Sequence, residues 1–393
     1  MTRPVFTAPT RVSSRTFAVG VAASLVFLST ARADRGQIDA ALEAMEAAVL
    51  AGDKDAYLAT VWQDDANFLQ EQKAWAADFD RHRAVAFDLR IDEKSETDFG
   101  DTEARFTLVM AWSMGAEVPR GGDRRVTYPV VFKKHDGVWL YAGEDWQVVN
   151  APGVDGSGGA VAKYLGRADH PANVVVEILP EGRAHVDEGF ENTIDHVQEV
   201  KLYNSMEHLQ ASIYLSYTDG LGGWNEPGEA IKVMADGCRR AGMARPLLAH
   251  EYGHCATFAF GPETSKMPWW VLEGVAELAA EKFGRSKERV GNQVRSWARD
   301  ADLAPWEEMA DFYTCPDKWH SHVYAQGHHF VGFVSEKWGR TARNKWLRLM
   351  AQGKTLDGAT REAFELSFAK VDRQWRQSLT QPAEGADATV VQP

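Results

Sequence analysis

The residues with the clearest chemical potential lie at positions 250 to 254, which read His-Glu-Tyr-Gly-His. Residues i and i+4 of an α-helix share one face, about 6 Å apart along the axis. The imidazoles of His250 and His254 can therefore meet at one metal ion, about 2.1 Å from each. Glu251 is then placed to accept the proton of a water molecule that the ion activates. The alternative is an ordinary helix with two polar histidines, because a chain with 12 histidines contains the bare pattern by chance in roughly 3 of 100 cases.

A catalytic zinc site needs a third protein ligand and an open position for water. Eighteen residues separate His254 from Glu273, which lies in the segment Pro-Trp-Trp-Val-Leu-Glu-Gly-Val-Ala-Glu at positions 268 to 277. This segment predicts a helix that begins after Pro268 and carries Glu273 and Glu277 one turn apart. Gly274 is a poor helix former, so its presence indicates that another element packs closely at that point. The alternative for both glutamates is a solvated helix surface.

Together these segments resemble the gluzincin zinc metallopeptidases, which have a peptidase MA-like domain. Their pattern is H-E-x-x-H followed by a glutamate ligand on a W-x-x-E-G-x-A-like helix. The resemblance implies that Glu273 is the third ligand of one Zn²⁺ per chain, with His250 and His254. It also implies that Glu277 orients a zinc-bound histidine. The ligand types alone leave open another divalent ion in the same His-His-Glu set.

A third segment, Tyr324-Ala-Gln-Gly, is similar to the Y-x-x-G segment of gluzincins. In that family the tyrosine hydroxyl stabilises the tetrahedral oxyanion, and the resemblance assigns this role to Tyr324. The alternative is a buried tyrosine that packs against nearby apolar side chains. Four histidines cluster in the same part of the chain: His320, His322, His328 and His329. We expect a structural role for each because the metal already has three ligands, and the alternative is that one of them also donates a hydrogen bond to the reaction intermediate.

One segment departs from the gluzincin aminopeptidases, which carry G-x-M-E-N upstream of the metal helix to hold the substrate's free amine. Positions 222 to 226 of this chain read Gly-Gly-Trp-Asn-Glu, with no methionine and with the last two residues exchanged. Residues 224 to 233 therefore predict a turn and an edge strand beside the cleft, where an extended peptide could pair. This favours an endopeptidase or a narrow processing enzyme, with an aminopeptidase as the alternative.

The elements around these residues predict an α+β fold in two domains. Residues 34–149 read as helices followed by alternating strands, with a hairpin turn at Asp136-Gly137. Pro129 indicates an edge or a bulge. This order resembles the cone-shaped SnoaL-like α+β fold with an antiparallel sheet. A linker at 150–159 then leads to a mainly helical domain at 160–380 with a small edge sheet, which the resemblance makes thermolysin-like. Residues 381–393 read as a disordered tail.

The amino terminus predicts export. Three arginines precede an apolar run that ends in Ala31-Arg32-Ala33, so residues 1–33 read as a signal peptide. The alternative is an uncleaved N-terminal anchor, and no other membrane association is expected. The net charge of −13 argues against a nucleic-acid partner, which needs a basic face. The three cysteines form no Cys-x-x-Cys pair and permit at most one internal disulfide.

The function that follows is that of an exported, periplasmic, cell-surface or secreted zinc peptidase that acts on a peptide or protein substrate. Glu251 would be the general base and Tyr324 the oxyanion donor. The chief alternative from another class is a secreted binding protein that retains zinc without useful turnover. The intact Glu251 argues against it, because degenerate proteases usually lose the general base.

Overall fold

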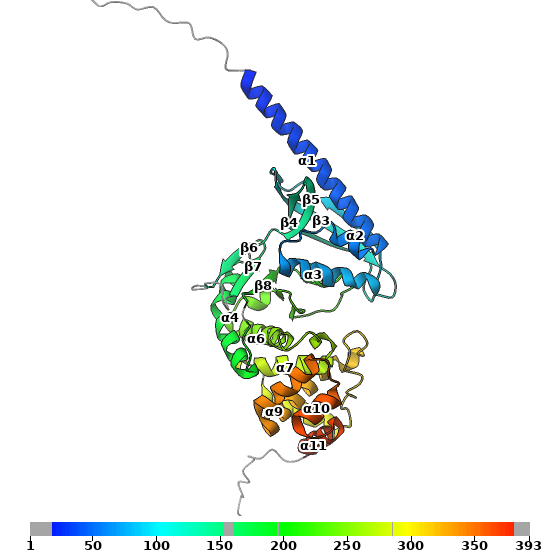
Figure 1. The fold of residues 1–393 in the computed structure, drawn as a ribbon, viewed down its shortest axis with the longest axis vertical. Coiled ribbons are helices and arrows are strands. Elements are labelled where there is room, and N and C mark those ends of the chain that lie inside the picture. The colour runs from blue at the N-terminus through cyan, green and yellow to red at the C-terminus, as the bar shows by residue number, and fades with distance from the viewer. Residues whose placement is uncertain (1–17, 152–159, 195, 285, 381–393) are drawn as a thin grey trace, which may run out of the picture. The chain divides into compact units, whose positions relative to one another are not determined.

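The computed structural model describes residues 18–151, 160–194, 196–284 and 286–380 (Figure 1). It contains two compact units, and each is described by itself below. The first comprises the residues up to Asp65 together with Ala76–Asp145, and the second comprises Ala66–Trp75 and the residues from Trp146 onward. The predicted α+β class is confirmed. The sequence had placed the end of the first domain at Val149, a few residues later, and had not indicated that Ala66–Trp75 belongs to the second unit.

The first unit is built on an antiparallel sheet in the order β1-β3-β4-β5, with β2 paired to β3. Alternation of buried and exposed side chains along β1, β3 and β5 produces one apolar face, as a half-buried strand requires. The elements of this unit are α1 (Ala18–Ala51), α2 (Lys54–Leu58), η1 (Asp78–Asp80), β1 (Ala84–Ile91), β2 (Asp98–Phe99), β3 (Glu103–Met114), β4 (Arg124–His135) and β5 (Val138–Glu144).

Two local predictions in this sheet can be compared with the structure. The hairpin between β4 and β5 turns at Asp136 and Gly137, whose φ angles of 50° and 83° are those of a type I′ turn. Pro129 lies in an interior strand, so the edge-strand alternative is wrong. The pairing of β4 with β5 shifts register between Val130 and Phe132, directly after the proline, which confirms the bulge alternative.

The second unit contains a five-stranded sheet in the order β6-β7-β8-β10-β9 and a larger helical part. Strands β7, β8 and β10 are parallel, while β6 and β9 form antiparallel edges. The strands are β6 (Gln147–Asn150), β7 (Ala160–Tyr164), β8 (Gln198–Tyr203), β9 (Gly223–Trp224) and β10 (Ile231–Met234). The helices are α3 (Ala66–Ala77), α4 (Asp169–Phe190), α5 (Met206–Ile213), α6 (Ala241–Phe258), α7 (Trp269–Ala280), α8 (Lys287–Arg299), α9 (His320–Ala351), α10 (Leu356–Phe364) and α11 (Phe368–Thr380).

Buried charge ties the segment Ala66–Trp75 of α3 to the second unit. The Glu71 carboxylate is 4% exposed, forms an ion pair with Lys201 of β8, and accepts the backbone N–H of Ala230 at 3.3 Å. The Trp75 indole donates to the carbonyl of Ala211 in α5 at 2.9 Å. A buried ammonium that lost its carboxylate would be strongly destabilising, so this segment contributes to the stability of the second unit.

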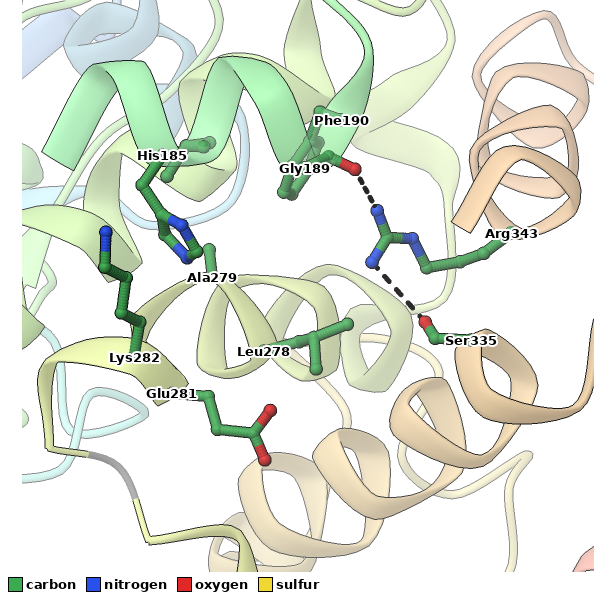
Figure 2. Close-up of a pocket in the computed structure, with 10 residues that line it drawn as sticks. His185, Gly189, Phe190, Leu278, Ala279, Glu281, Lys282, Ser335 and Arg343 are labelled. Carbon is green, nitrogen blue, oxygen red and sulfur yellow. Dashed lines mark hydrogen bonds between the residues drawn. The ribbon is translucent and has the colours of Figure 1, made fainter. Parts of the chain in front are cut away.

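A cavity of about 410 Å³ lies in the second unit, between α4, the end of α7 and α9, and Figure 2 shows residues that line it. His185 and Gly189 line it from α4, and Arg343 and Ser335 line it from α9. Arg343 donates to the Gly189 carbonyl at 2.5 Å and to the Ser335 hydroxyl at 3.4 Å. None of the lining residues is one of the residues with predicted catalytic or metal-binding roles.

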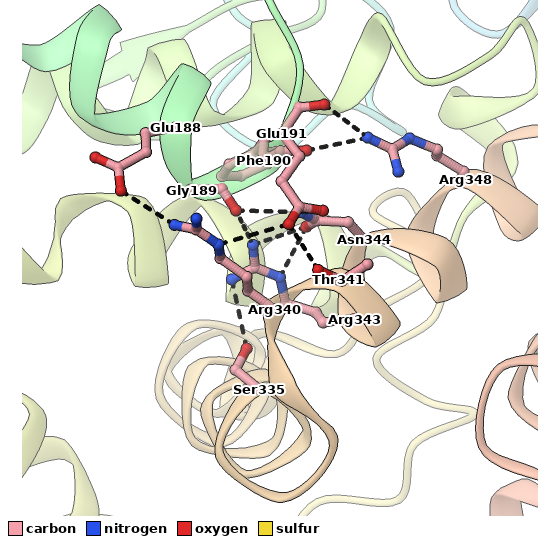
Figure 3. A network of polar contacts seen from close by, with 10 residues as sticks. All are labelled: Glu188, Gly189, Phe190, Glu191, Ser335, Arg340, Thr341, Arg343, Asn344 and Arg348. Atoms are coloured by element: carbon pink, nitrogen blue, oxygen red, sulfur yellow. Dashed lines mark hydrogen bonds and ion pairs between the residues drawn. The ribbon is translucent and has the colours of Figure 1, made fainter.

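The carboxyl end of α4 is held by cations of α9 (Figure 3). Arg343 and Asn344 donate to the Gly189 carbonyl, and Arg348 donates to the Glu191 carbonyl at 2.9 Å. Glu191 is left-handed, with φ of 51°, which ends the helix. Helix carboxyl ends leave carbonyls unpaired and carry partial negative charge, so these donors stabilise the end of α4 on both counts.

Several sequence predictions fall largely outside the described residues: the start of the signal peptide (1–17), most of the linker (152–159) and the tail (381–393). Helix α1 begins at Ala18, within the predicted signal segment. Of the helices that the structure describes, none combines the length and apolar character needed to cross a bilayer. Export therefore stays a prediction.

Candidate metal centre

Helix α6 presents the first three predicted site residues. His250, Glu251 and His254 are buried on it, and the Nε2 atoms of the two histidines lie 3.3 Å apart. Helix α6 begins at Ala241, and Pro246 lies inside it. A proline interior to a helix lacks one backbone hydrogen bond, and here this falls one turn before the histidines.

Helix α7, which begins directly after Pro268 as predicted, brings Glu273 to the same point. Its Oε2 atom lies 3.3 Å from His250 Nε2 and 3.6 Å from His254 Nε2. In a tetrahedral site with ligands about 2.0–2.2 Å from the ion, the ligand atoms lie about 3.3–3.6 Å from one another. The three donor atoms therefore have the spacing that one metal ion requires, and they form a buried group suited to hold one.

A glycine allows the two helices to approach so closely. Gly253 lies on α6 between the two histidines, and a Cβ there would be 3.1 Å from the backbone of Ala276 and 3.0 Å from the Ala279 side chain. A side chain at this position would push α7 back by a few tenths of an ångström, so glycine favours the close approach. The close packing brings the carboxylate of Glu273 within reach of imidazoles on the neighbouring helix.

The electrostatics of the group favour a cation at its centre. Burial alone lowers the pKa of His250, but the carboxylates of Glu273 and Glu277 raise it to about 10. For Glu273, burial raises the pKa, yet the His254 and His250 imidazoles outweigh it and the net pKa is lowered. Oε2 of Glu273 is buried and has no hydrogen-bond donor among the described residues. Buried charges are tolerated when paired or bound to a metal, and this orphaned oxygen fits a metal ligand.

Glu277 and Glu251 lie on either side of this group. Glu277 Oε1 is 3.3 Å from Nδ1 of His250, an ion-pair contact without hydrogen-bond geometry, on the side of the ring from which a carboxylate orients a metal-binding histidine. Burial raises the pKa of Glu251, which the imidazoles oppose and the carboxylates of Glu273 and Glu277 reinforce. A carboxyl whose pKa is raised in this way is suited to take up a proton near neutral pH.

Tyr324 lies on α9 beside the group, with its ring centroid 6.3 Å from that of His250. The residue as a whole is 38% exposed, whereas its phenol group is desolvated; this desolvation, followed by the charges of Glu273 and Glu251, raises the pKa of the phenol well above the usual value. The hydroxyl therefore stays protonated and can donate a hydrogen bond. The alternative of a fully buried packing tyrosine does not match this exposure.

A second glycine contact sets the position of Tyr324. Helices α7 and α9 cross with backbone against backbone, since a Cβ on Gly274 would lie 2.5 Å from the carbonyl carbon of Gly327. A Cβ on Gly327 would in turn overlap the carbonyl oxygen of Trp270. The close packing that the sequence predicted at Gly274 is confirmed. Gly274 follows Glu273 and Gly327 lies one turn after Tyr324, so this crossing sets the distance between metal ligand and phenol.

An edge strand lies beside the general-base candidate, but at Gly223–Trp224 (β9); the strand inside the predicted range 224–233 is β10, which is interior because β9 pairs with it on the outer side. Strand β9 is an antiparallel edge, and a Cβ on its Gly223 would overlap the Glu251 carboxylate. Asn225 donates to the Glu251 carbonyl at 3.3 Å and to Cys255 Sγ at 3.0 Å. The Glu226 carboxylate is near Tyr214, whose pKa it raises after the larger effect of burial. Asn225 therefore contacts the metal helix at the residue that follows His250.

The remaining histidines and cysteines have structural contacts. His322 stacks on Trp297 with centroids 3.7 Å apart, and His329 accepts the Trp375 indole N–H at 3.0 Å. His320 packs against Trp269, and His328 lies 3.7 Å from Glu281. All three cysteines lie in the described part and have free thiols.

Sequence reasoning missed two contributors, Trp269 and Gly223. The Trp269 indole donates to Glu273 Oε1 at 2.9 Å, while Gly223 gives the Glu251 carboxylate its room. The i, i+4 spacing of Trp269 and Glu273 on the predicted helix could have indicated the first contact. No local signal could have indicated the second, because Gly223 and Glu251 are distant in the sequence.

Comparison with known proteins gives a likeness of fold only. No protein-family profile matches the chain, and no curated protein matches it. A crystal structure of a mutant M1 zinc metallopeptidase from Deinococcus radiodurans is similar, with 14% identity and a TM-score of 0.40 over 76% of this chain and 71% of that chain. A second structure of that metallopeptidase has 14% sequence identity and a TM-score of 0.38, and the match covers 77% of this chain and 63% of that chain. The structure of a mutant of that metallopeptidase bound to a Tyr-Ser-Ala substrate has 15% sequence identity and a TM-score of 0.39. The match covers 76% of this chain and 71% of that chain.

Proposed function

We propose that this protein is an exported zinc-dependent peptidase. The observation that carries the proposal is the meeting of His250, His254 and Glu273 at tetrahedral spacing, with Glu251 next to them in sequence and a phenol beside them. Two imidazoles and one carboxylate are a ligand set of catalytic zinc sites, and they leave one position open. Zinc held there supplies Lewis-acid chemistry and activates water for attack on a carbonyl.

The side chains around that position have the roles that peptide hydrolysis requires. Glu251 accepts the proton of the attacking water and then delivers it to the leaving amine, for which its raised pKa is suited. Tyr324 donates its hydroxyl hydrogen to the oxyanion, where negative charge develops in the transition state. Glu277 holds the ring of His250 through Nδ1, so that Nε2 faces the metal position.

The deciding experiment compares Glu251→Gln with wild type on the purified full chain. The variant should retain one zinc per chain by elemental analysis and lose at least about a hundredfold in kcat, because the amide cannot accept the proton. Glu281→Gln serves as the matched control, since Glu281 is a partly buried carboxylate of the same unit outside the metal group. Full activity in Glu251→Gln would refute the mechanism, and a chain without metal would refute the site.

The contact of Asn225 with the metal helix α6 favours internal cleavage over aminopeptidase action, because the side chain that contacts the residue next to the zinc ligands is an amide, which carries no charge to pair with a free amine. Peptides blocked at the amino end separate the two. Cleavage of blocked peptides supports an endopeptidase, and an absolute need for a free amine supports an aminopeptidase. Zinc without hydrolysis of any peptide would instead support the binding-protein alternative.

A further inference from the structure

The two oxygens of Glu273 have different surroundings. Oε1 accepts the indole N–H of Trp269 at 2.9 Å, in a pair whose members are 8% and 9% exposed. Oε2 faces the two imidazole Nε2 atoms at 3.3 Å and 3.6 Å and accepts no hydrogen bond from a described residue. One oxygen is therefore occupied by the protein, and the other points to the metal position.

This division matters because a carboxylate can bind a metal through one oxygen or through both. Binding through both oxygens would take up coordination space that a catalytic site keeps for water. The indole N–H is a donor only, so Trp269 cannot compete for the metal. Its hydrogen bond occupies one lone pair of Oε1, draws negative charge toward that oxygen, and fixes the rotation of the carboxylate plane. Partners of this kind tune a metal site through the orientation of its ligands.

Trp269 is itself held in place. It is the first residue of α7, four positions before Glu273, and its backbone N–H donates to the Ala310 carbonyl at 2.8 Å. Its ring lies edge-on to Phe312, with centroids 5.1 Å apart, and to Tyr324 at 6.1 Å. A ring restricted by these two T-shaped contacts and by its anchored backbone presents its N–H in one direction. The donor is therefore positioned before a metal binds, and so is the carboxylate.

We infer that Trp269 is a positioning residue that makes Glu273 bind the metal through Oε2 alone. This inference rests on the proposed function, since it concerns the same metal group. Its consequence is that removal of the indole N–H changes both the affinity for zinc and the coordination of the bound ion. A purely structural role in packing would change neither when the ring shape is retained.

The test compares Trp269→Phe with Trp306→Phe, a control in the same unit that loses an equivalent bond. The Trp306 indole is 7% exposed and donates to the Asp372 carboxylate at 2.8 Å. Zinc affinity is measured by competition with a coloured chelator, and coordination by the visible absorption of the cobalt(II)-substituted protein. Trp269→Phe should bind zinc about 10 to 100 times more weakly. Its cobalt absorption should weaken as the coordination number rises, whereas Trp306→Phe should match wild type in both.

A second variant covers the case in which Trp269→Phe fails to fold. Replacement of the Trp269 indole by benzothiophene keeps the bicyclic shape and removes only the N–H. Zinc affinity within twofold of wild type in that variant would overturn the inference, as would equal losses in Trp269→Phe and Trp306→Phe. If wild type binds zinc in these experiments, the proposed metal site stands whichever way Trp269 behaves. If wild type binds no metal, the proposed function fails first, and the inference fails with it.

Discussion

The contact between α7 and α9 leads to a prediction that connects packing with activity. Gly274 on α7 and Gly327 on α9 meet backbone to backbone, next to Glu273 and one turn from Tyr324. Gly274→Ala would place a methyl group 2.5 Å from the carbonyl carbon of Gly327 and 2.6 Å from its oxygen. Non-bonded carbon contacts are normally about 3.5–4.0 Å, so the helices must separate by roughly 1 Å at this point.

The size of the effect follows from two opposing terms. Overpacking against rigid backbone costs about 3 kcal/mol at the upper end of the usual range. Alanine regains about 1 kcal/mol through its better helix propensity, so Gly274→Ala should destabilise the protein by about 2 kcal/mol. The separation also moves the Tyr324 phenol relative to Glu273, and a displacement of about 1 Å near reacting groups lowers kcat about a hundredfold.

The assay is urea unfolding for stability and peptide hydrolysis for kcat, with Gly332→Ala as the control. Gly332 is also on α9, but a Cβ there meets no atom within 4 Å. This control should be as active as wild type and more stable by up to about 1 kcal/mol. A Gly274→Ala protein with the stability and kcat of wild type would refute the reasoning that the crossing sets the distance between ligand and phenol.

Three further predictions concern the same unit. Gly223→Ala should lower kcat about tenfold or more with zinc content unchanged, because its Cβ would displace the Glu251 carboxylate. The control Gly222→Ala should keep the kcat of wild type, because its Cβ would lie 3.5 Å from its nearest neighbour. Equal kcat values for the two variants would contradict this prediction. Burial lowers the pKa of His329 to about 4, so the folded state binds fewer protons than the unfolded state below pH 6.5. Stability should therefore fall by up to about 3 kcal/mol from pH 6.5 to pH 4, and His329→Gln should lose less over this range in urea unfolding. Removal of zinc by a chelator should lower the melting temperature, because an ion present at a thousand times its Kd stabilises the folded state by about 4 kcal/mol. An unchanged melting curve would count against the metal site.

Part of this architecture could be predicted because the signals are local. The hairpin at Asp136-Gly137 requires two consecutive residues with positive φ, and the sequence places suitable residues there. The start of α7 after Pro268 and the close packing at Gly274 could likewise be predicted from single residue types. Proline restricts the backbone and favours a helix start, and glycine lacks the side chain that would keep another helix away.

Other features depended on partners distant in the sequence. Pro129 suited an edge strand or a bulge equally, and only the neighbours β3 and β5 made its strand an interior one. The segment Ala66–Trp75 reads as an ordinary helix. Its assignment to the second unit rests on a buried ion pair between Glu71 and Lys201, which are 130 residues apart.

The sequence by itself therefore determined which side chains share a helix face: His250 with His254, and Glu273 with Glu277, because helical periodicity converts spacing into geometry. Only the tertiary structure decided that the two faces meet, at the contact of Gly253 with α7. It also decided which oxygen of Glu273 faces the imidazoles, since that depends on the orientation of the Trp269 ring. The physical reason is that periodicity acts over a few residues, whereas helix packing and carboxylate orientation depend on side chains brought together from distant parts of the chain.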